Sequence, residues 1–350
     1  MTMDALYAVI VEERQLLLAT EDIVPDRLAP KEILVEAETS VISAGTELAI
    51  YTAIAPGVRS PGSWNAYPFR PGYGVVGRVL ARGSEVMHLQ ERERILCFGT
   101  HASRQILNVC GDTPRQAAFP IGEDLSAETA VMLRMALIAF AAPLAAQGEA
   151  GDTVCVLGLG VVGNLAAQLF QRAGMRVIAL DVVPQRCDLA RQVGIETALA
   201  VDPDEQVETI RDLTGGKGVA IAVDAVGDSR VVANCIQACA PFGKVILLGS
   251  PRVAVQSNLT DSFRAIHNNW LTVKGALEWR LPPYLVVGMK HSIQSVVDSL
   301  TDLVRAGHLL VDPLITHRIR PDQLAEAYEG LLASKEDYLG VVVEWRARRP

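Results

Sequence analysis

The chain has 350 residues, of which 50% are hydrophobic and 21% are charged, and its formal net charge is −8. This length exceeds one ordinary domain and predicts two domains of roughly 100–200 residues each. The acidic balance argues against nucleic acid or an anionic membrane as the main partner, because either would repel the chain. We therefore expect a small-molecule ligand.

The N-terminus lacks the basic and apolar regions of a signal peptide, so we expect a cytoplasmic protein. The longest apolar stretch, residues 135–146, contains Pro143 and is shorter than the ~20 residues of a membrane span. We therefore expect no transmembrane segment. The six cysteines form no C-x-x-C pair, which predicts neither a disulfide nor a Cys-rich zinc site.

The first 130 residues contain short runs of alternating apolar and polar residues separated by Gly and Pro. Such alternation predicts half-buried strands, here at 5–11, 32–43, 73–81, 94–98 and 103–109. The region is expected to be mostly β, in a barrel-like domain. Between residues 41 and 71 the pattern breaks into an irregular passage rich in Gly, Pro, Ser, Trp and Tyr, which is typical of loops that line sites.

After residue 150 strands and helices alternate, which predicts a doubly wound parallel sheet. The expected strands are 153–157, 177–180, 198–201, 220–225, 244–248 and 271–276, and the expected helices are 161–173, 184–193, 207–213 and 230–240. The last seventy residues predict a helix at 284–306, a strand at 314–319, a helix at 321–334 and a strand at 340–345.

A nucleotide-binding fingerprint, Gly158-Leu159-Gly160-Val161-Val162-Gly163, follows the apolar strand 153–157 and opens the next helix. The first Gly permits the tight turn, the second lets backbone approach a pyrophosphate, and the third lets helix pack on strand. The phosphates would face the helix N-terminus, beside Val161 and Val162.

Asp181 ends the second strand, 18 residues after Gly163. An acidic residue there accepts hydrogen bonds from the adenosine ribose and repels a 2′-phosphate, so it favours NAD(H) over NADP(H). Arg186, five residues on, is the residue that would instead favour NADP(H). Further contacts to the cofactor are expected after later strands, from Val226, Gly249, Ser250 and Leu277.

The order of these parts resembles the medium-chain dehydrogenase/reductase superfamily, which includes the zinc alcohol and polyol dehydrogenases. The resemblance is carried by the segments PGYGVVGRV (71–79), GDTVCVLGLGVVGNLAAQLFQRAG (151–174), VDAVG (223–227) and PFGKVILLG (241–249). It implies an α/β fold with a GroES-like catalytic domain (1–130 with 281–350) and a Rossmann domain (131–280).

The zinc ligands of this family have no counterparts here. By the resemblance, Ala44 replaces the first ligand, Gly72-Tyr73-Gly74 replaces Gly-His-Glu, and Arg134 falls near the third ligand, while the four-cysteine structural lobe is missing. A cationic Arg is the opposite of a zinc ligand. Catalytic zinc is therefore not expected. The histidines at 101, 267, 291 and 317 show no ligand spacing and are expected to be surface or structural.

Without zinc, hydrogen bonds or a fixed positive charge must polarise the substrate. Thr46 matches the family's proton-relay hydroxyl, and Tyr73 and Arg134 stand where ligands would be, although Tyr73 fits simple packing equally well. Arg134 would either pair with Glu47 or meet an anionic substrate or cofactor phosphate. Substrate contacts are assigned to four residues near or in the irregular loop: Glu47, Tyr51, Trp64 and Tyr67.

The resemblance implies metal-independent hydride transfer between NAD(H) and a secondary alcohol or ketone. It leaves two alternatives: reduction of an activated C=C bond, as in enoyl or quinone reductases, and a non-catalytic NAD(H)-binding protein. The substrate is not identified by the sequence. We also expect a homodimer through the edge strand at 271–276, because an apolar edge strand carries unpaired backbone groups.

Overall fold

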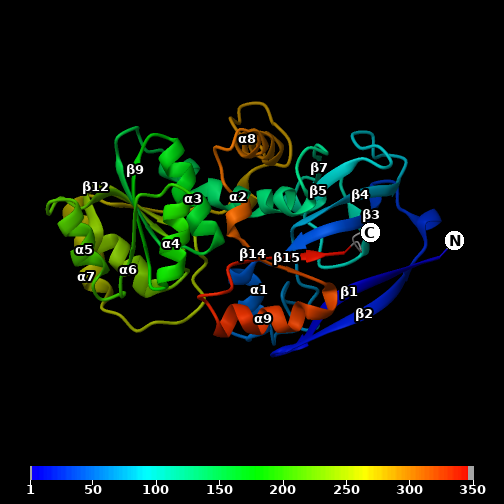
Figure 1. The fold of residues 1–350 in the computed structure, drawn as a ribbon, viewed down its shortest axis with the longest axis horizontal. Coiled ribbons are helices and arrows are strands. Elements are labelled where there is room, and N and C mark those ends of the chain that lie inside the picture. The colour runs from blue at the N-terminus through cyan, green and yellow to red at the C-terminus, as the bar shows by residue number, and fades with distance from the viewer. Residues whose placement is uncertain (1, 346–350) are drawn as a thin grey trace. The chain divides into compact units, whose positions relative to one another are not determined.

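The computed structural model describes residues 2–345, which divide into two compact units. Unit 1 comprises the residues up to Arg134, Trp279–Arg305 and the residues from Ile315 onward. Unit 2 comprises Met135–Glu278 and Ala306–Leu314. Figure 1 draws unit 1 mainly in blue, cyan and red and unit 2 mainly in green and yellow.

Unit 2 is built on a six-stranded parallel sheet with helices on both faces (Figure 1). Its strand order is β10-β9-β8-β11-β12-β13. This is the strand order of the dinucleotide-binding doubly wound fold. From β8 the chain adds strands first on one side of the sheet, to β10, and then on the other side, from β11 to β13, so the switch point lies between β8 and β11. The strands are β8 (Thr153–Leu157), β9 (Arg176–Asp181), β10 (Thr197–Ala200), β11 (Val219–Asp224), β12 (Cys239–Leu247) and β13 (Thr272–Gly275).

Strands of a parallel sheet are covered on both faces and so consist of continuous apolar runs. Val154 to Leu157 are all completely buried. The covering helices are α3 (Val161–Arg172), α4 (Pro184–Gln192), α5 (Gln206–Leu213), α6 (Ser229–Ala238) and α7 (Leu259–Asn269). The predicted α/β fold with a parallel Rossmann sheet is confirmed.

Unit 1 contains a seven-stranded sheet of order β14-β15-β3-β4-β5-β7, in which β6 also pairs with β3. All its pairings are antiparallel except β14 with β15. The strands are β3 (Glu32–Val41), β4 (Val75–Arg82), β5 (Arg94–Cys97), β6 (Arg104–Asn108), β7 (Ala118–Pro120), β14 (Ile315–Ile319) and β15 (Gly340–Glu344), and a hairpin joins β1 (Met3–Glu12) to β2 (Gln15–Ile23).

The described part of unit 1 contains the helices α1 (Ala44–Tyr51), α8 (Ile293–Arg305) and α9 (Leu324–Ala333). Helix α2 (Ala127–Ala146) begins in unit 1 and belongs to unit 2 after Arg134. Short 3-10 turns complete the chain at Pro25–Arg27, Pro114–Gln116, Glu278–Arg280, Asp312–Leu314 and Pro321–Gln323.

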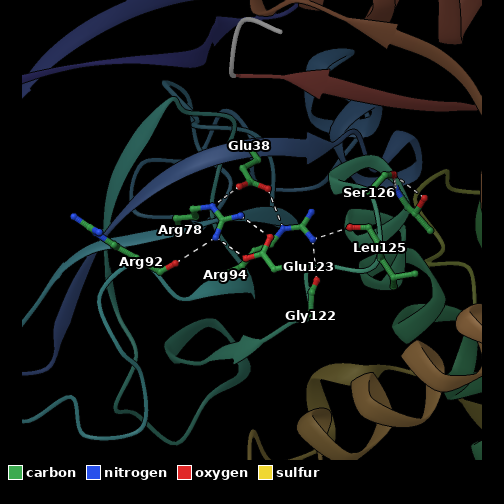
Figure 2. A network of polar contacts seen from close by, with 9 residues as sticks. Glu38, Arg78, Arg92, Arg94, Gly122, Glu123, Leu125 and Ser126 are labelled. Carbon is green, nitrogen blue, oxygen red and sulfur yellow. Dashed lines mark hydrogen bonds and ion pairs between the residues drawn. The ribbon is translucent and has the colours of Figure 1, made fainter. Parts of the chain in front are cut away.

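An ion network around the buried Arg94 fixes the start of α2 against the sheet (Figure 2). Arg94, 5% exposed, donates to Glu38 Oε2 at 2.9 Å and to the carbonyl oxygens of Gly122 and Leu125 at 2.9 and 2.7 Å. Arg78 joins the other oxygen of Glu38 at 2.8 Å. Ser126 then caps the helix, since its Oγ accepts from Thr129 N at 3.0 Å. The helix that carries Arg134 is therefore anchored to β3, β4 and β5.

Two expectations are corrected in the C-terminal part. The helix predicted at 284–306 begins only at Ile293, because prolines and a glycine occupy the segment before it and Ser292 Oγ accepts from Ser295 N at 3.1 Å. Residues 306–314, predicted with the catalytic domain, belong to unit 2. Gln168 of α3 holds them there, since it accepts from Leu310 N at 2.8 Å and donates to Leu310 O at 3.0 Å.

Helix α2 is longer than the apolar stretch recognised in the sequence. Its 20 residues, with a mean hydropathy of 1.8 over an 18-residue window, meet the length and composition of a membrane span. However, 72% of that window is buried inside the protein, as in the core helix of a globular domain.

Candidate active site

The glycine fingerprint forms a tight loop between β8 and α3 in unit 2. Gly158 has φ +98°, and a Cβ on Gly163 would lie 1.9 Å from Gly158 O. A Cβ on Gly160 would meet nothing within 4 Å, so the space beside this glycine is not filled by other residues. Gly160 also caps α3 without a side-chain hydrogen bond. A glycine with free space beside it, at the N-terminus of a helix, lets the pyrophosphate of a dinucleotide approach the backbone N–H groups.

Asp181, at the end of β9, lies across this loop. Its Oδ2 accepts from Leu159 N at 2.6 Å and its Oδ1 accepts from Val183 N at 2.9 Å. A carboxylate has about four acceptor positions, so both oxygens retain capacity for the two ribose hydroxyls. Arg186 Nη1 lies 3.9 Å from Asp181 Oδ2.

The loops after β11 and β12 meet the glycine loop at the switch point of the sheet. A Cβ on Gly158 would lie 2.7 Å from Val226 Cγ2, and a Cβ on Gly249 would lie 2.2 Å from Gly227 N. Val226 is 49% exposed and Leu277 is also 49% exposed, while Ser250 is exposed beside Gly249. The fingerprint residues, Asp181, Val226 and Gly249 are therefore brought together at one edge of unit 2.

Asp224 was not singled out in the sequence, yet it organises these loops. It is completely buried, and its Oδ1 accepts from Val226 N at 2.9 Å and Gly227 N at 3.0 Å. Its Oδ2 has no hydrogen-bond partner among residues 2–345. Burial raises the pKa of this carboxyl above its ordinary value, against the lowering effect of the two N–H groups.

In unit 1, the hydroxyls predicted for catalysis lie together. Tyr73 OH contacts Ser43 Oγ in a short hydrogen bond and lies 3.5 Å from Thr46 Oγ1. Ser43 and Thr46 lie at the start of α1, and Tyr73 lies two residues before β4. Burial raises the pKa of Tyr73, although the charge of Arg134 opposes this effect, so the phenol keeps its proton at neutral pH.

Arg134 lies in an aromatic cage of unit 1 and is completely buried. Its guanidinium carbon is 4.6 Å from the ring centre of Tyr73, 4.8 Å from that of Phe98 and 5.2 Å from that of Trp279. Its Nε donates to Tyr73 O at 3.1 Å. Trp279, which the sequence analysis missed, therefore completes the wall beside Tyr73.

Glu47 is a buried structural acid and not a substrate contact. It is 1% exposed, and its Oε1 accepts from Ser43 N at 2.7 Å. Its Oε2 lies 2.9 Å from His101 Nε2 and accepts from Tyr328 OH in a short hydrogen bond. The pairing of Glu47 with Arg134, one of the two alternatives, does not form.

His101 extends this buried network away from Glu47. Its Nδ1 lies 2.7 Å from Ser40 Oγ, which also accepts from Trp345 Nε1 at 2.8 Å. The network therefore links α1, β3, α9 and Trp345, which follows β15, and it holds the backbone of Ser43. No spacing in the sequence signals that His101 and Tyr328 meet Glu47.

Of the other predicted substrate residues, two have structural roles. Tyr51 is 2% exposed, packs against Tyr328 at 5.1 Å and hydrogen-bonds Glu329 at 2.9 Å. Tyr67 OH donates to Ile50 O. Both hydroxyls are therefore engaged by partners within unit 1. Trp64 is 62% exposed and remains available.

The residues at the family's zinc positions do not fit zinc. Ala44 offers no ligand atom, the Tyr73 hydroxyl is bonded to Ser43, and Arg134 is a cation. Between residues 2 and 345, no three or more His, Cys, Asp or Glu side chains are grouped to hold a metal ion. Zinc sites in proteins are built from such side chains.

Comparison with known proteins agrees with this architecture. Residues 161–282 match the family model of the zinc-binding dehydrogenases. An (R,R)-butanediol dehydrogenase of Neisseria gonorrhoeae is 25% identical over 233 residues, which cover 65% of this chain and only 60% of that relative. A D-guloside 3-dehydrogenase of Shigella flexneri is 24% identical over 299 residues, 79% of this chain and 83% of the relative.

Solved structures share the fold over nearly the whole chain. An Escherichia coli oxidoreductase of unknown specificity has a TM-score of 0.80 at 16% identity, covering 98% of this chain and 99% of its own. Galactitol-1-phosphate dehydrogenase of E. coli has a TM-score of 0.79 at 18% identity, covering 97% and 99%. An E. coli alcohol dehydrogenase complexed with NADH has a TM-score of 0.77 at 17% identity, with the same coverage.

Proposed function

We propose that this oxidoreductase, a chain of the medium-chain dehydrogenase/reductase superfamily, transfers a hydride between NAD(H) and a secondary alcohol or ketone without zinc, in the cytoplasm. Its relatives include alcohol and polyol dehydrogenases. The observation that carries the proposal is the placement of Tyr73, Thr46 and Ser43 beside a buried guanidinium, where zinc members would hold their metal.

The cofactor choice rests on Asp181. The bound nicotinamide would supply the hydride. Gly158, Gly160 and Gly163 would leave room for the pyrophosphate, and the helix N-terminus would face its charge. Asp181 would accept from the ribose hydroxyls and repel a 2′-phosphate. Arg186 lies close to this carboxylate, which offsets part of its charge.

Tyr73 is the proposed proton donor to the substrate oxygen. Its raised pKa keeps it protonated, and the hydroxyl of Ser43 or Thr46 can pass a proton back to it. The positive charge of Arg134 favours negative charge on Tyr73 as the proton leaves. The buried Glu47 would hold Ser43 in place through its backbone N–H.

The experiment is NADH oxidation with a panel of ketones and enones, using protein whose metal content has been determined. Tyr73→Phe should lower kcat about 10²–10⁴-fold, the usual contribution of a general acid. Thr52→Val, a loss of a hydroxyl bonded to Leu48 O, is the matched control. Activity that requires zinc would refute the proposal, and turnover of enones alone would favour C=C reduction. NADH binding with no turnover would favour a non-catalytic protein.

A further inference from the structure

Arg115 lies over two indole rings of unit 1. Its guanidinium carbon is 5.3 Å from the ring centre of Trp279 and 5.6 Å from that of Trp64. The residue is exposed and belongs to the short turn Pro114–Gln116. A guanidinium that rests on aromatic faces keeps the in-plane N–H donors at its edge. Arg115 is therefore oriented while its donors stay accessible.

A second cation contacts the same indole. Arg134 lies 5.2 Å from the ring centre of Trp279. Desolvation lowers the pKa of Arg115, and the charge of Arg134 lowers it further. Across residues 2–345, no carboxylate forms an ion pair with Arg115. An anion at Arg115 would therefore meet a guanidinium that none of the described carboxylates pairs with.

Aromatic rings extend from Arg115 to Tyr73. The ring centre of Trp279 is 6.3 Å from that of Tyr73 and 5.3 Å from that of Phe98. Trp64 packs edge-on against Phe69 at 6.1 Å but stays 62% exposed. One indole thus separates the accessible guanidinium from the proposed proton donor.

We propose that Arg115 binds an anionic group of the substrate, a carboxylate or a phosphate, while Trp64 and Trp279 contact a planar apolar part of the same molecule. Both groups present paired oxygens that match the guanidinium fork. The inference rests on the proposed function and names its substrate class as a planar ketone or secondary alcohol that carries an anion. Arg115 is then a specificity residue.

The test measures binding without turnover by the quenching of tryptophan fluorescence, to which Trp64 and Trp279 contribute two of the four tryptophans of the chain. The probes are 4-acetylbenzoate, 4-acetylphenyl phosphate and the neutral 4-acetylbenzamide. We expect at least one anion to bind about tenfold more tightly than the amide, the size of one charge-assisted hydrogen bond. Tighter binding of 4-acetylbenzoate would indicate a carboxylate site, and tighter binding of 4-acetylphenyl phosphate would indicate a phosphate site.

Arg115→Met should abolish this preference, and Arg115→Lys should retain part of it because the charge remains. Arg320→Met makes the same change in charge at an exposed arginine paired with Asp322, and it should leave the preference intact. Equal binding of all three probes to the wild type, or a preference that survives in Arg115→Met, would overturn the inference. An anion preference without NADH oxidation would support the anion site and refute the proposed reaction.

Discussion

Arg134 occupies the space that any side chain at residue 74 would need. A Cβ on Gly74 would lie 2.7 Å from Arg134 Cγ and 3.0 Å from Val41 Cγ1. The resemblance places a glutamate of the zinc members at this position and a ligand near Arg134. The absence of a side chain at Gly74 therefore makes room for the side chain of Arg134, whose guanidinium lies where the zinc members would hold their metal.

Gly74→Ala should lower the free energy of unfolding by about 1–3 kcal/mol, the usual cost of overpacking a core. Arg134 is completely buried and the start of its helix is held by Arg94, so its side chain has little room to move away from an added methyl group. Chemical denaturation gives the value. Gly160→Ala is the control, because its Cβ would meet nothing within 4 Å. Equal effects of the two substitutions would show that Arg134 does not fill this space.

Asp181→Ala should weaken NADH binding about 10–100-fold and narrow the preference for NADH over NADPH. The variant loses charge-assisted hydrogen bonds to the ribose and the repulsion of a 2′-phosphate. Dissociation constants for both cofactors give the answer, with Asp188→Ala, an exposed acid on α4, as the control. A wild-type protein that prefers NADPH would contradict the assignment of Asp181.

Much of unit 2 could be predicted because its signals are local. The fingerprint, the apolar strands and the helix that starts at Pro184 each follow from neighbouring residues. Helix α2 escaped prediction since it is buried almost all round and therefore lacks an amphipathic stripe. Helix α1 is only eight residues long and follows the strand β3 closely.

The site of unit 1 was predictable only where a motif marked it. Thr46, Tyr73 and Arg134 were found through the positions of the zinc ligands, and the structure groups Tyr73 with each of the other two. His101 and Tyr328 lie 54 and 281 residues from Glu47, so only the folded chain brings them to it. For the same reason the partners of the Tyr51 and Tyr67 hydroxyls could not be predicted, because tertiary packing brings Glu329 and Ile50 O to them.

The stability of an Asp224→Asn variant should differ from that of the wild type in a pH-dependent way. Burial raises the folded-state pKa of Asp224 above the ordinary value of 3.8. At pH values between the unfolded-state pKa and the folded-state pKa, the native state binds more protons than the unfolded state. The free energy of unfolding therefore falls as the pH rises through this range. Asparagine does not ionise, so the free energy of unfolding of the variant, relative to that of the wild type, should be higher at pH 7 than at pH 4.

Denaturation of both proteins at a series of pH values between 4 and 7 measures this difference. Asp112→Asn provides a control at an exposed aspartate. A difference that stays constant, or grows as the pH falls, would mean that the Asp224 carboxylate is not destabilised by burial.

We expect a homodimer through the β13 edge of unit 2. Phe242 and Trp270 are 71% and 76% exposed, and their ring centres lie 5.7 Å apart beside this edge. Phe242→Ser should therefore yield monomer in light scattering, whereas Leu213→Ser, at an exposed leucine on α5, should not. Leu271 is unsuitable for the test because it is 7% exposed and belongs to the core. A wild-type monomer at micromolar concentration would contradict the dimer.

The most direct test of the central claim follows deuterium from [4,4-²H₂]NADH into an aromatic enone such as 4-phenylbut-3-en-2-one, using protein freed of metal by a chelator. Mass spectrometry and NMR of the product locate the label. The account predicts deuterium on the carbinol carbon, at an unchanged rate after chelation. Deuterium on the β-carbon, or transfer that returns only when zinc is added, would contradict it.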